Sequence, residues 1–115
     1  MPNKRRLIFQ EEFRASLLNG TKTATMRRAS SPNVKALVPG DIVIGVDGLF
    51  TRVVDGFAQF DVTEVQTLSW GEITDTHLAR TRATREWYES RYGAAVHGML
   101  FKFIGLRLIE GGTRG

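Results

Sequence analysis

The sequence predicts a small α+β domain, in which five to six strands form a curled sheet or small barrel with short helices. Three observations predict it. Segments rich in β-branched or alternating residues recur between turn signals, and short helical patterns stand only after the first strand and before the last. No long crossover helices alternate with the strands, which excludes a parallel doubly wound sheet. The 115 residues suffice for one domain, predicted at residues 1–109, followed by a disordered tail at 110–115.

The first elements are a strand at 4–9 and a short helix at 10–18. Glu11 and Glu12 favour the positive N-terminal end of this helix, and Asn19-Gly20 supplies a C-terminal cap. The apolar residues of the helix, Phe13 and Leu17, lie four apart and therefore on one face.

The next strand, predicted at 21–28, has one polar and one apolar face. Thr23, Thr25 and Arg27 alternate with Ala24 and Met26, which is the period of a half-buried strand. Threonine is a good strand former, so a solvated strand face is one interpretation of this pattern. A cleft lined by these polar side chains is the other.

The rest of the chain continues with strands, then two helices, then a final strand. Pro39-Gly40 forms a type II turn before a strand at 41–46, and Asp47-Gly48 and Asp55-Gly56 mark hairpin turns. Ser69 and Glu72 have the spacing of a capping box, which makes Glu72 a capping residue in the simplest interpretation. The remaining predicted elements are strands at 51–54, 57–65 and 99–109 and helices at 75–82 and 84–92.

Composition narrows the possible chemistry. The chain has no cysteine, and His77 and His97 stand far apart, so we predict no metal site, no iron–sulfur cluster and no cofactor. The apolar run near the N-terminus is too short for a signal peptide or a membrane span, so we expect a cytoplasmic protein without membrane contact. The net charge of +4 favours polyanionic partners, although arginine-rich composition also follows from a GC-rich genome.

The order of motifs resembles the ASCH family of small PUA-like β-barrels, and within it the bacterial N(4)-acetylcytidine amidohydrolase branch. The resemblance covers residues 7–109 and depends most on Leu17-Leu18-Asn19-Gly20-Thr21-Lys22-Thr23-Ala24-Thr25-Met26-Arg27, followed by Pro39-Gly40-Asp41 at the start of a strand. The later matches are Ile73-Thr74-Asp75, His77-Leu78-Ala79-Arg80, Trp87, Tyr92 and Leu106-Arg107-Leu108.

In the amidohydrolase branch a lysine, a threonine and a glutamate form the catalytic group. The resemblance implies Lys22 and Thr25 for the first two, but the glutamate would fall at or beside Thr81 and Arg82, where this sequence has no acid. Thr25 needs a base to act as a nucleophile, and Lys22 can be that base only if it is desolvated or lies close to another cation such as Arg27. The acids that remain as replacements for the glutamate are Glu64, Glu72 and Asp75.

Our leading prediction is binding of RNA, another nucleic acid or a cytidine-like modified nucleoside in a basic cleft. The predicted binding residues are Lys22, Thr23, Thr25, Arg27, Arg28, Arg80, Arg82 and Arg85. Aromatic side chains that could stack a base are Trp70, Trp87, Tyr88 and Tyr92, with packing on the sheet as the competing role for Trp87. The alternative function is an amidohydrolase that removes an acyl group from the exocyclic amine of cytidine. RNA-strand cleavage ranks last, because the sequence has no histidine pair or metal site to support it. The oligomeric state stays open.

Overall fold

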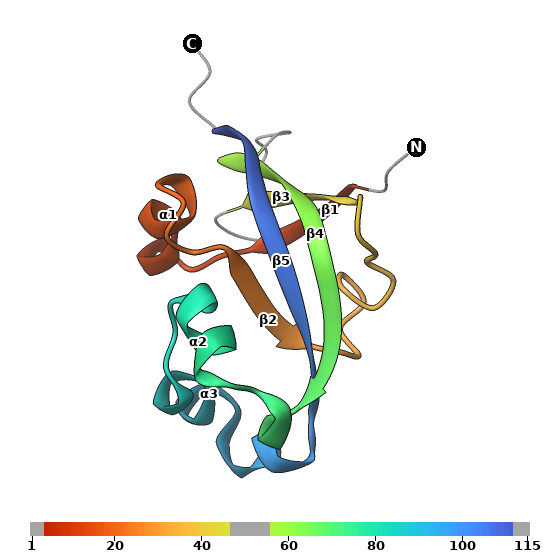
Figure 1. Ribbon diagram of the computed structural model, residues 1–115, viewed down its shortest axis with the longest axis vertical. Coiled ribbons are helices and arrows are strands. Elements are labelled where there is room, and N and C mark those ends of the chain that lie inside the picture. The colour runs from red at the N-terminus through yellow and green to blue at the C-terminus, as the bar shows by residue number, and fades with distance from the viewer. Residues whose placement is uncertain (1–3, 47–55, 112–115) are drawn as a thin grey trace.

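A computed structural model describes residues 4–46 and 56–111, and within them five strands form one curled sheet. The strands are β1 (Lys4–Ile8), β2 (Ala24–Arg28), β3 (Ile42–Val46), β4 (Ala58–Ser69) and β5 (Leu100–Gly111), in the spatial order β1-β3-β4-β5-β2. β1 and β3 are parallel, and the other pairs are antiparallel. Figure 1 shows β4 and β5 as a long twisted ribbon that forms the centre of the sheet.

Three α-helices of the described chain cover one side of this sheet (Figure 1). They are α1 (Glu11–Leu18), α2 (Asp75–Thr81) and α3 (Arg85–Tyr92). Two short 3-10 helices, η1 (Trp70–Glu72) and η2 (Gly93–Gly98), complete the connections on either side of α2 and α3. The predicted α+β fold class is confirmed, as are the helices that the sequence predicts after the first strand and before the last.

Local chemistry explains where these elements begin and end. Ser69 and Glu72 form the predicted capping box at η1, and the Thr84 hydroxyl accepts a hydrogen bond from the Trp87 backbone N–H at the start of α3. Gly93 ends α3 with a φ of 63°, a value that glycine adopts without steric penalty. β2 begins at Ala24, three residues later than predicted, because the backbone N–H groups of Lys22 and Thr23 donate to carbonyl oxygens of Ser16 in α1 and Arg80 in α2.

Two elements differ from the predicted boundaries at the ends of the sheet. β4 continues to Ser69, where it still pairs with Leu100, so it is longer than the predicted strand at 57–65. β5 continues through Glu110 to Gly111, which lie in the predicted tail, because its backbone still pairs with the start of β4. The predicted strand at 51–54 and the Asp47-Gly48 turn fall outside the described residues, as does most of the predicted tail.

The core consists of two clusters that meet at α1. In one cluster, buried residues of β1, β3, β4 and β5 pack against Leu17 of α1. In the other, buried residues of β2 and β5, among them Phe101, pack against α2 and against Tyr88 of α3. Phe13 contacts both clusters and is only half-buried. The junction of the two clusters is therefore where the packing leaves room for a cavity.

Candidate nucleotide-binding cleft

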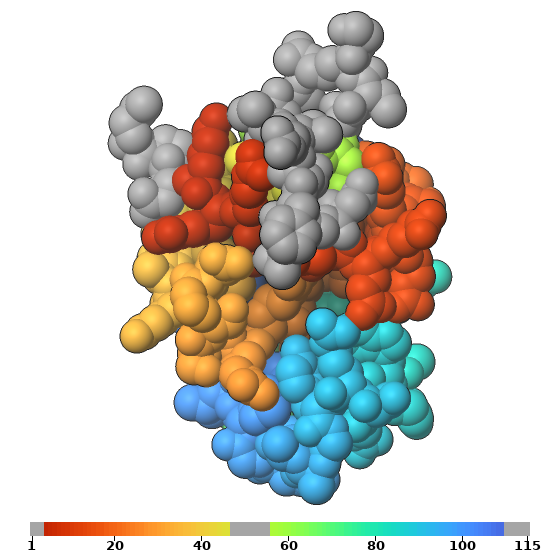
Figure 2. All heavy atoms as spheres, turned by 180° about the vertical axis from the view of Figure 1, so that it is seen from behind, coloured from red at the N-terminus to blue at the C-terminus, as the bar shows by residue number. Residues whose placement is uncertain are grey.

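A cleft of about 450 Å³ opens at this junction, and its volume is in the range of small-molecule sites. Figure 2 shows the hollow on the face opposite that of Figure 1, between the segment around residue 30, α1 and α3. The cleft is lined by Ile8, Phe9, Gln10, Phe13, Lys22, Thr25, Met26, Arg27, Arg28, Ser30, Ser31, Pro32, Trp87, Tyr88, Arg91 and Tyr92. Its described lining combines aromatic rings, cations and hydroxyl groups, and contains no aspartate or glutamate.

Lys22 is turned into the protein by the short segment between α1 and β2. Its backbone N–H donates to the Ser16 carbonyl oxygen, while that of Thr23 donates to the Arg80 carbonyl oxygen, so both helices hold the segment. The side chain of Lys22 is 4% exposed, and its Nζ atom lies 4.5 Å from the centre of the Phe13 ring and donates to the Thr81 carbonyl oxygen. This lysine is therefore almost completely removed from water.

Burial, together with the nearby Arg27 guanidinium, lowers the pKa of Lys22 from 10.5 to about 7. Lys22 can act as a base if it is desolvated or lies close to another cation, and the structure meets both conditions. At neutral pH a large fraction of Lys22 carries no proton and can accept one.

Thr25 lies in the middle of β2 and is 4% exposed, so it does not lie on a solvated strand face. Its Oγ1 atom accepts a hydrogen bond from Arg27 Nε at 3.2 Å. Because that bond uses a lone pair of the hydroxyl, the Thr25 proton is available to a base or a ligand. The guanidinium charge also favours loss of this proton.

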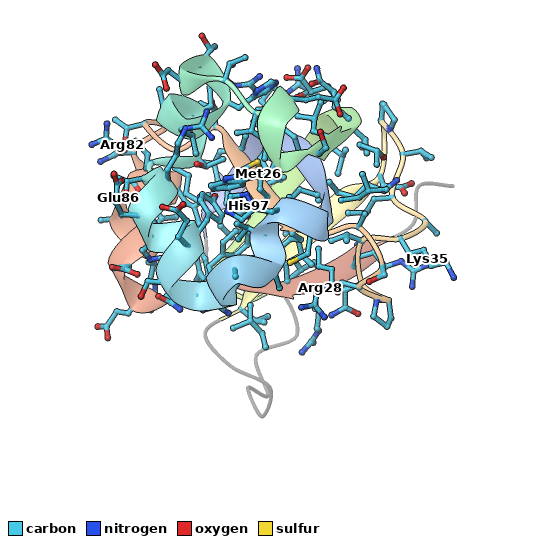
Figure 3. All side chains as sticks on the ribbon, turned by 90° about the horizontal axis from the view of Figure 1, so that it is seen from below. Met26, Arg28, Lys35, Arg82, Glu86 and His97 are labelled. Carbon is cyan, nitrogen blue, oxygen red and sulfur yellow. The ribbon has the colours of Figure 1, made fainter. Side chains whose placement is uncertain are left out.

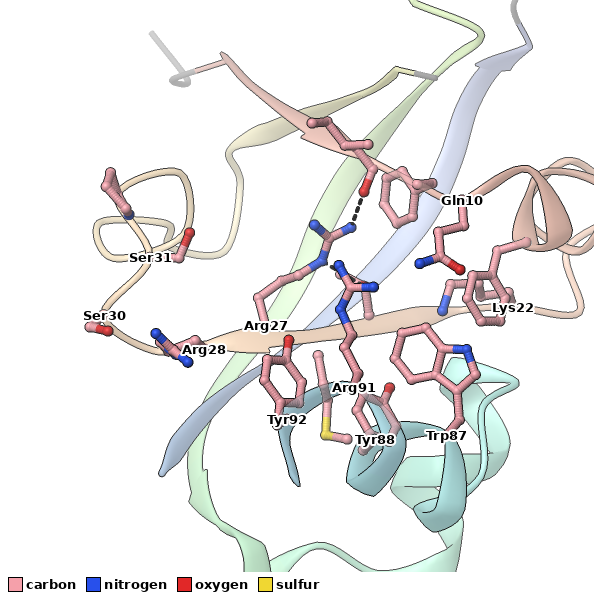
Figure 4. Close-up of a pocket in the computed structure, with 16 residues that line it drawn as sticks. Gln10, Lys22, Arg27, Arg28, Ser30, Ser31, Trp87, Tyr88, Arg91 and Tyr92 are labelled. Atoms are coloured by element: carbon pink, nitrogen blue, oxygen red, sulfur yellow. Dashed lines mark hydrogen bonds between the residues drawn. The ribbon is translucent and has the colours of Figure 1, made fainter. Parts of the chain in front are cut away.

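Arg27 is both a wall of the cleft and a connection between two strands. Its Nη2 atom donates to the Ile8 carbonyl oxygen of β1 at 2.7 Å, and its guanidinium carbon lies 4.9 Å from the centre of the Phe9 ring (Figure 4). Burial lowers the pKa of Arg27 to about 10, which leaves the guanidinium charged at neutral pH. A positive charge is therefore fixed at the centre of the cleft.

Aromatic side chains of α3 form the facing wall. Trp87 is half-buried, packs edge-on against Phe13 at 5.5 Å between ring centres, and donates from Nε1 to Glu12 Oε1 at 3.2 Å. Tyr88 is buried, shares a hydrogen bond with the Thr81 side chain, and has its pKa raised to about 12 by burial, so its hydroxyl stays protonated. Trp87 therefore packs against α1 and also lines the cleft.

The predicted binding residues divide into two groups. Lys22, Thr25, Arg27 and Arg28 line the cleft, but Thr23, Arg80, Arg82 and Arg85 do not. Arg80 is paired with Glu64 and donates to Thr23 Oγ1 at 3.0 Å, while Arg85 donates to the Ile73 carbonyl oxygen. Figure 3 shows Arg82 on the opposite side of the molecule from Arg28.

None of the acids considered as replacements for the absent glutamate lines the cleft. Glu64 is paired with Arg80, Glu72 belongs to the capping box at Ser69, and Asp75 starts α2. The resemblance places the glutamate at or beside Thr81 and Arg82, and neither residue lines the cleft. Thr81 is fully buried, and its carbonyl oxygen accepts the hydrogen bond of Lys22.

Sequence patterns left out several lining residues, chiefly Phe9, Gln10, Phe13 and Ser31. Phe13 repeats with Leu17 at helical spacing, which marks a core face and says nothing about a cavity beside it. Of the four arginines that the sequence places on or beside the two later helices, Arg80, Arg82, Arg85 and Arg91, only Arg91 lines the cleft. In the described part of the chain, no group of three or more His, Cys, Asp or Glu residues could hold a metal ion. Nor does any helix there have the length and apolar character needed to cross a membrane.

Comparison with known proteins identifies the fold. No family model matches the sequence, and no curated protein matches it. Among solved structures, the chain is similar to protein EF3133 from Enterococcus faecalis, assigned to DUF984, with a TM-score of 0.69 and 15% identity over 100% of this chain and 84% of that one.

Two ASCH structures are similar to the chain at 10% identity. The ASCH protein of Zymomonas mobilis has a TM-score of 0.69 over 91% of this chain and 67% of that one. The ASCH domain of Lactobacillus crispatus has a TM-score of 0.67 over 94% of this chain and 80% of that one. The chain therefore has the ASCH-domain fold that the sequence resemblance predicts.

Proposed function

We propose that the cleft binds a nucleoside unit, either free and modified or exposed in single-stranded RNA. The observation that supports this most is the composition of the described lining, in which aromatic rings and cations occur together without a carboxylate. Aromatic side chains stack on bases, and arginine side chains pair with phosphates and base edges.

The arrangement of these groups favours a flat ligand. Trp87 and Phe13 form one end of the cleft, and the buried Lys22 and Thr25 lie in its interior with polar atoms that can contact a base edge. A lysine that titrates near neutral pH and a threonine hydroxyl can each either donate or accept a hydrogen bond.

Calorimetric titration with the four ribonucleosides, N(4)-acetylcytidine and a short single-stranded RNA tests this function. We expect Trp87→Leu to weaken binding about tenfold or more, because stacking on an aromatic side chain contributes about 1–3 kcal/mol per base. The control is Arg82→Gln, a change outside the cleft that should leave affinity unchanged. Failure of the wild-type protein to bind any of these ligands would contradict the proposal.

A second function, hydrolysis of an N(4)-acylcytidine, is favoured by one specific observation, the pKa of about 7 for Lys22. In this reaction Lys22 takes the proton of Thr25 as Oγ1 attacks the acyl carbon, and then gives that proton to the leaving exocyclic amine. Water next hydrolyses the acyl-threonine ester and regenerates the hydroxyl. Lys22 thus moves the proton in both directions without a carboxylate.

The two functions predict different results in one assay. If the protein is a hydrolase, ultraviolet-monitored turnover of N(4)-acetylcytidine rises with pH through about 7, as Lys22 loses its proton, and is abolished by Lys22→Met and by Thr25→Val. Binding without turnover would leave the first function and exclude the second for this substrate. Turnover that survives both substitutions would contradict the roles of Lys22 and Thr25.

A further inference from the structure

The cations that line the cleft are not equivalent. Lys22 is buried and donates to the Thr81 carbonyl oxygen, while Arg27 is held by the Ile8 carbonyl oxygen and Thr25 Oγ1. Arg91 Nη1 lies 2.7 Å from the side-chain amide of Gln10, whose oxygen accepts from it when the amide is oriented to suit both of its neighbours. Each of these groups already has a protein partner.

Arg28 differs from the other three cations. It is exposed, and within the described residues its guanidinium has neither a hydrogen bond nor an ion pair; its guanidinium carbon lies 6.0 Å from the centre of the Tyr92 ring. A guanidinium group presents five N–H donors, so Arg28 offers them to whatever enters the cleft. Its charge is not balanced by any acid in the described lining.

Two hydroxyl groups lie next to Arg28 on a turn that is already formed. The Ser31 backbone N–H donates to the Arg28 carbonyl oxygen at 3.0 Å, and the Ser31 carbonyl oxygen accepts from Lys35 N–H at 2.9 Å. Val34 is completely buried and anchors this turn to the core. Ser30 and Ser31 therefore line the cleft on a fixed segment of backbone.

Figure 4 shows how these groups are distributed along the cleft. Arg28, Ser30 and Ser31 lie at one end, while Lys22, Gln10 and Trp87 lie at the other, with Arg27 and Arg91 between them. One end thus has hydroxyl groups and a guanidinium that no described residue holds by a hydrogen bond or ion pair, and the other has aromatic rings around a lysine that is buried and partly neutral.

We propose that the end formed by Arg28, Ser30 and Ser31 is a phosphate subsite, so that the cleft takes a nucleotide whose base points toward Trp87 and Lys22. An arginine fork and neighbouring hydroxyls match the oxygen geometry of a phosphate group, and a charged acceptor strengthens each hydrogen bond. The inference rests on the proposed function, because it needs the opposite end to hold the base. It adds that the ligand is a nucleotide and not a bare nucleoside.

The test compares the four ribonucleosides with their 5′- and 3′-monophosphates and with dinucleoside monophosphates, all titrated calorimetrically into the same protein. At least one phosphate-bearing ligand is expected to bind about tenfold or more tightly than its nucleoside. The tightest class identifies the source of the phosphate, a free nucleotide or an RNA strand. Arg28→Gln should remove most of this preference and leave nucleoside affinity within about twofold.

Arg82→Gln is the matched control, because it deletes the same charge on the opposite side of the molecule (Figure 3) and should preserve the preference. Equal affinities for nucleosides and phosphate-bearing ligands would overturn the phosphate subsite while leaving the proposed function intact. A preference that survives Arg28→Gln would also overturn it. If no nucleoside and no phosphate-bearing ligand binds, the proposed function and the subsite both fail.

Discussion

The protonation of Lys22 depends on its burial, which the sequence around it does not reveal. The motif places a lysine three residues before Thr25, but an exposed lysine there would be protonated at neutral pH. Phe13 of α1 and the carbonyl oxygen of Thr81 in α2 enclose the amine, and the absence of a carboxylate in the described lining leaves its charge without a counterion. The residue could be predicted as a candidate, whereas its burial depends on contacts between distant segments.

The lowered pKa of Lys22 makes protein stability depend on pH in a defined direction. Between about pH 7 and 10 the unfolded chain keeps a proton on this lysine that the folded protein lacks, so the free energy of unfolding rises with pH in that window. Lys22→Met removes this contribution. We expect the difference in unfolding free energy, wild type minus Lys22→Met, to increase by up to about 1.4 kcal/mol per pH unit between pH 7 and 9.

Urea unfolding at several pH values in this window measures that difference. Parallel stability curves for the two proteins would show that Lys22 keeps an ordinary pKa. The measurement stops below pH 10 because the unfolded chain also loses the proton of this lysine near its ordinary pKa of 10.5, and the difference then no longer changes with pH.

At the scale of elements, local patterns predict most of the helices and strands but not how they enclose a cleft. Capping signals and alternation place α1, α3 and β3 within a residue or two, because these signals act through nearby backbone atoms. Which arginines of the later helices reach the cleft depends on the packing of α2 and α3, and Arg80, Arg82 and Arg85 point elsewhere. Only part of the predicted basic surface therefore lines the cleft.

Arg27 should stabilise the fold as well as the site, because it joins β2 to β1 where no backbone pairing links these two strands in the described sheet. We expect Arg27→Ala to lower the free energy of unfolding by about 2–3 kcal/mol, since it removes charge-assisted hydrogen bonds to Ile8 and Thr25. Arg107→Ala, which breaks only an exposed pair with Asp61, should change it by less than about 1 kcal/mol. Chemical denaturation of both variants checks this, and equal losses would contradict a special role for Arg27.

The two helical walls of the cleft should be energetically coupled through Phe13 and Trp87. Their rings pack edge to face, and such aromatic pairs contribute about 0.5–1.5 kcal/mol beyond burial of their area. A double-mutant cycle with Phe13→Leu and Trp87→Leu should give a coupling energy in unfolding of that size. Additive effects of the two substitutions would mean that α1 and α3 form the walls independently.

For the binding of a nucleic acid, the distribution of charge over the molecule matters more than its net charge of +4. If RNA binds at the cleft, its affinity depends on Arg27, Arg28 and Arg91 and not on all basic residues. Each phosphate of a single strand that one of these cations neutralises contributes about −0.7 to the slope of the logarithm of the binding constant against the logarithm of salt concentration. Arg28→Glu should weaken RNA binding and flatten this slope, while Arg82→Glu should do neither. Equal effects of the two substitutions would indicate that the nucleic acid contacts the whole basic surface.

The measurement that tests the central claim most directly is mapping of a nucleotide onto the protein by NMR, through backbone amide shifts during titration with the four ribonucleoside 5′-monophosphates. The account predicts saturable shifts around the cleft, at residues 22–31 and 87–92, with little change at Arg82 and Arg85. Shifts confined to the Arg82 and Arg85 side, or no saturable shift with any of the four nucleotides, would contradict it.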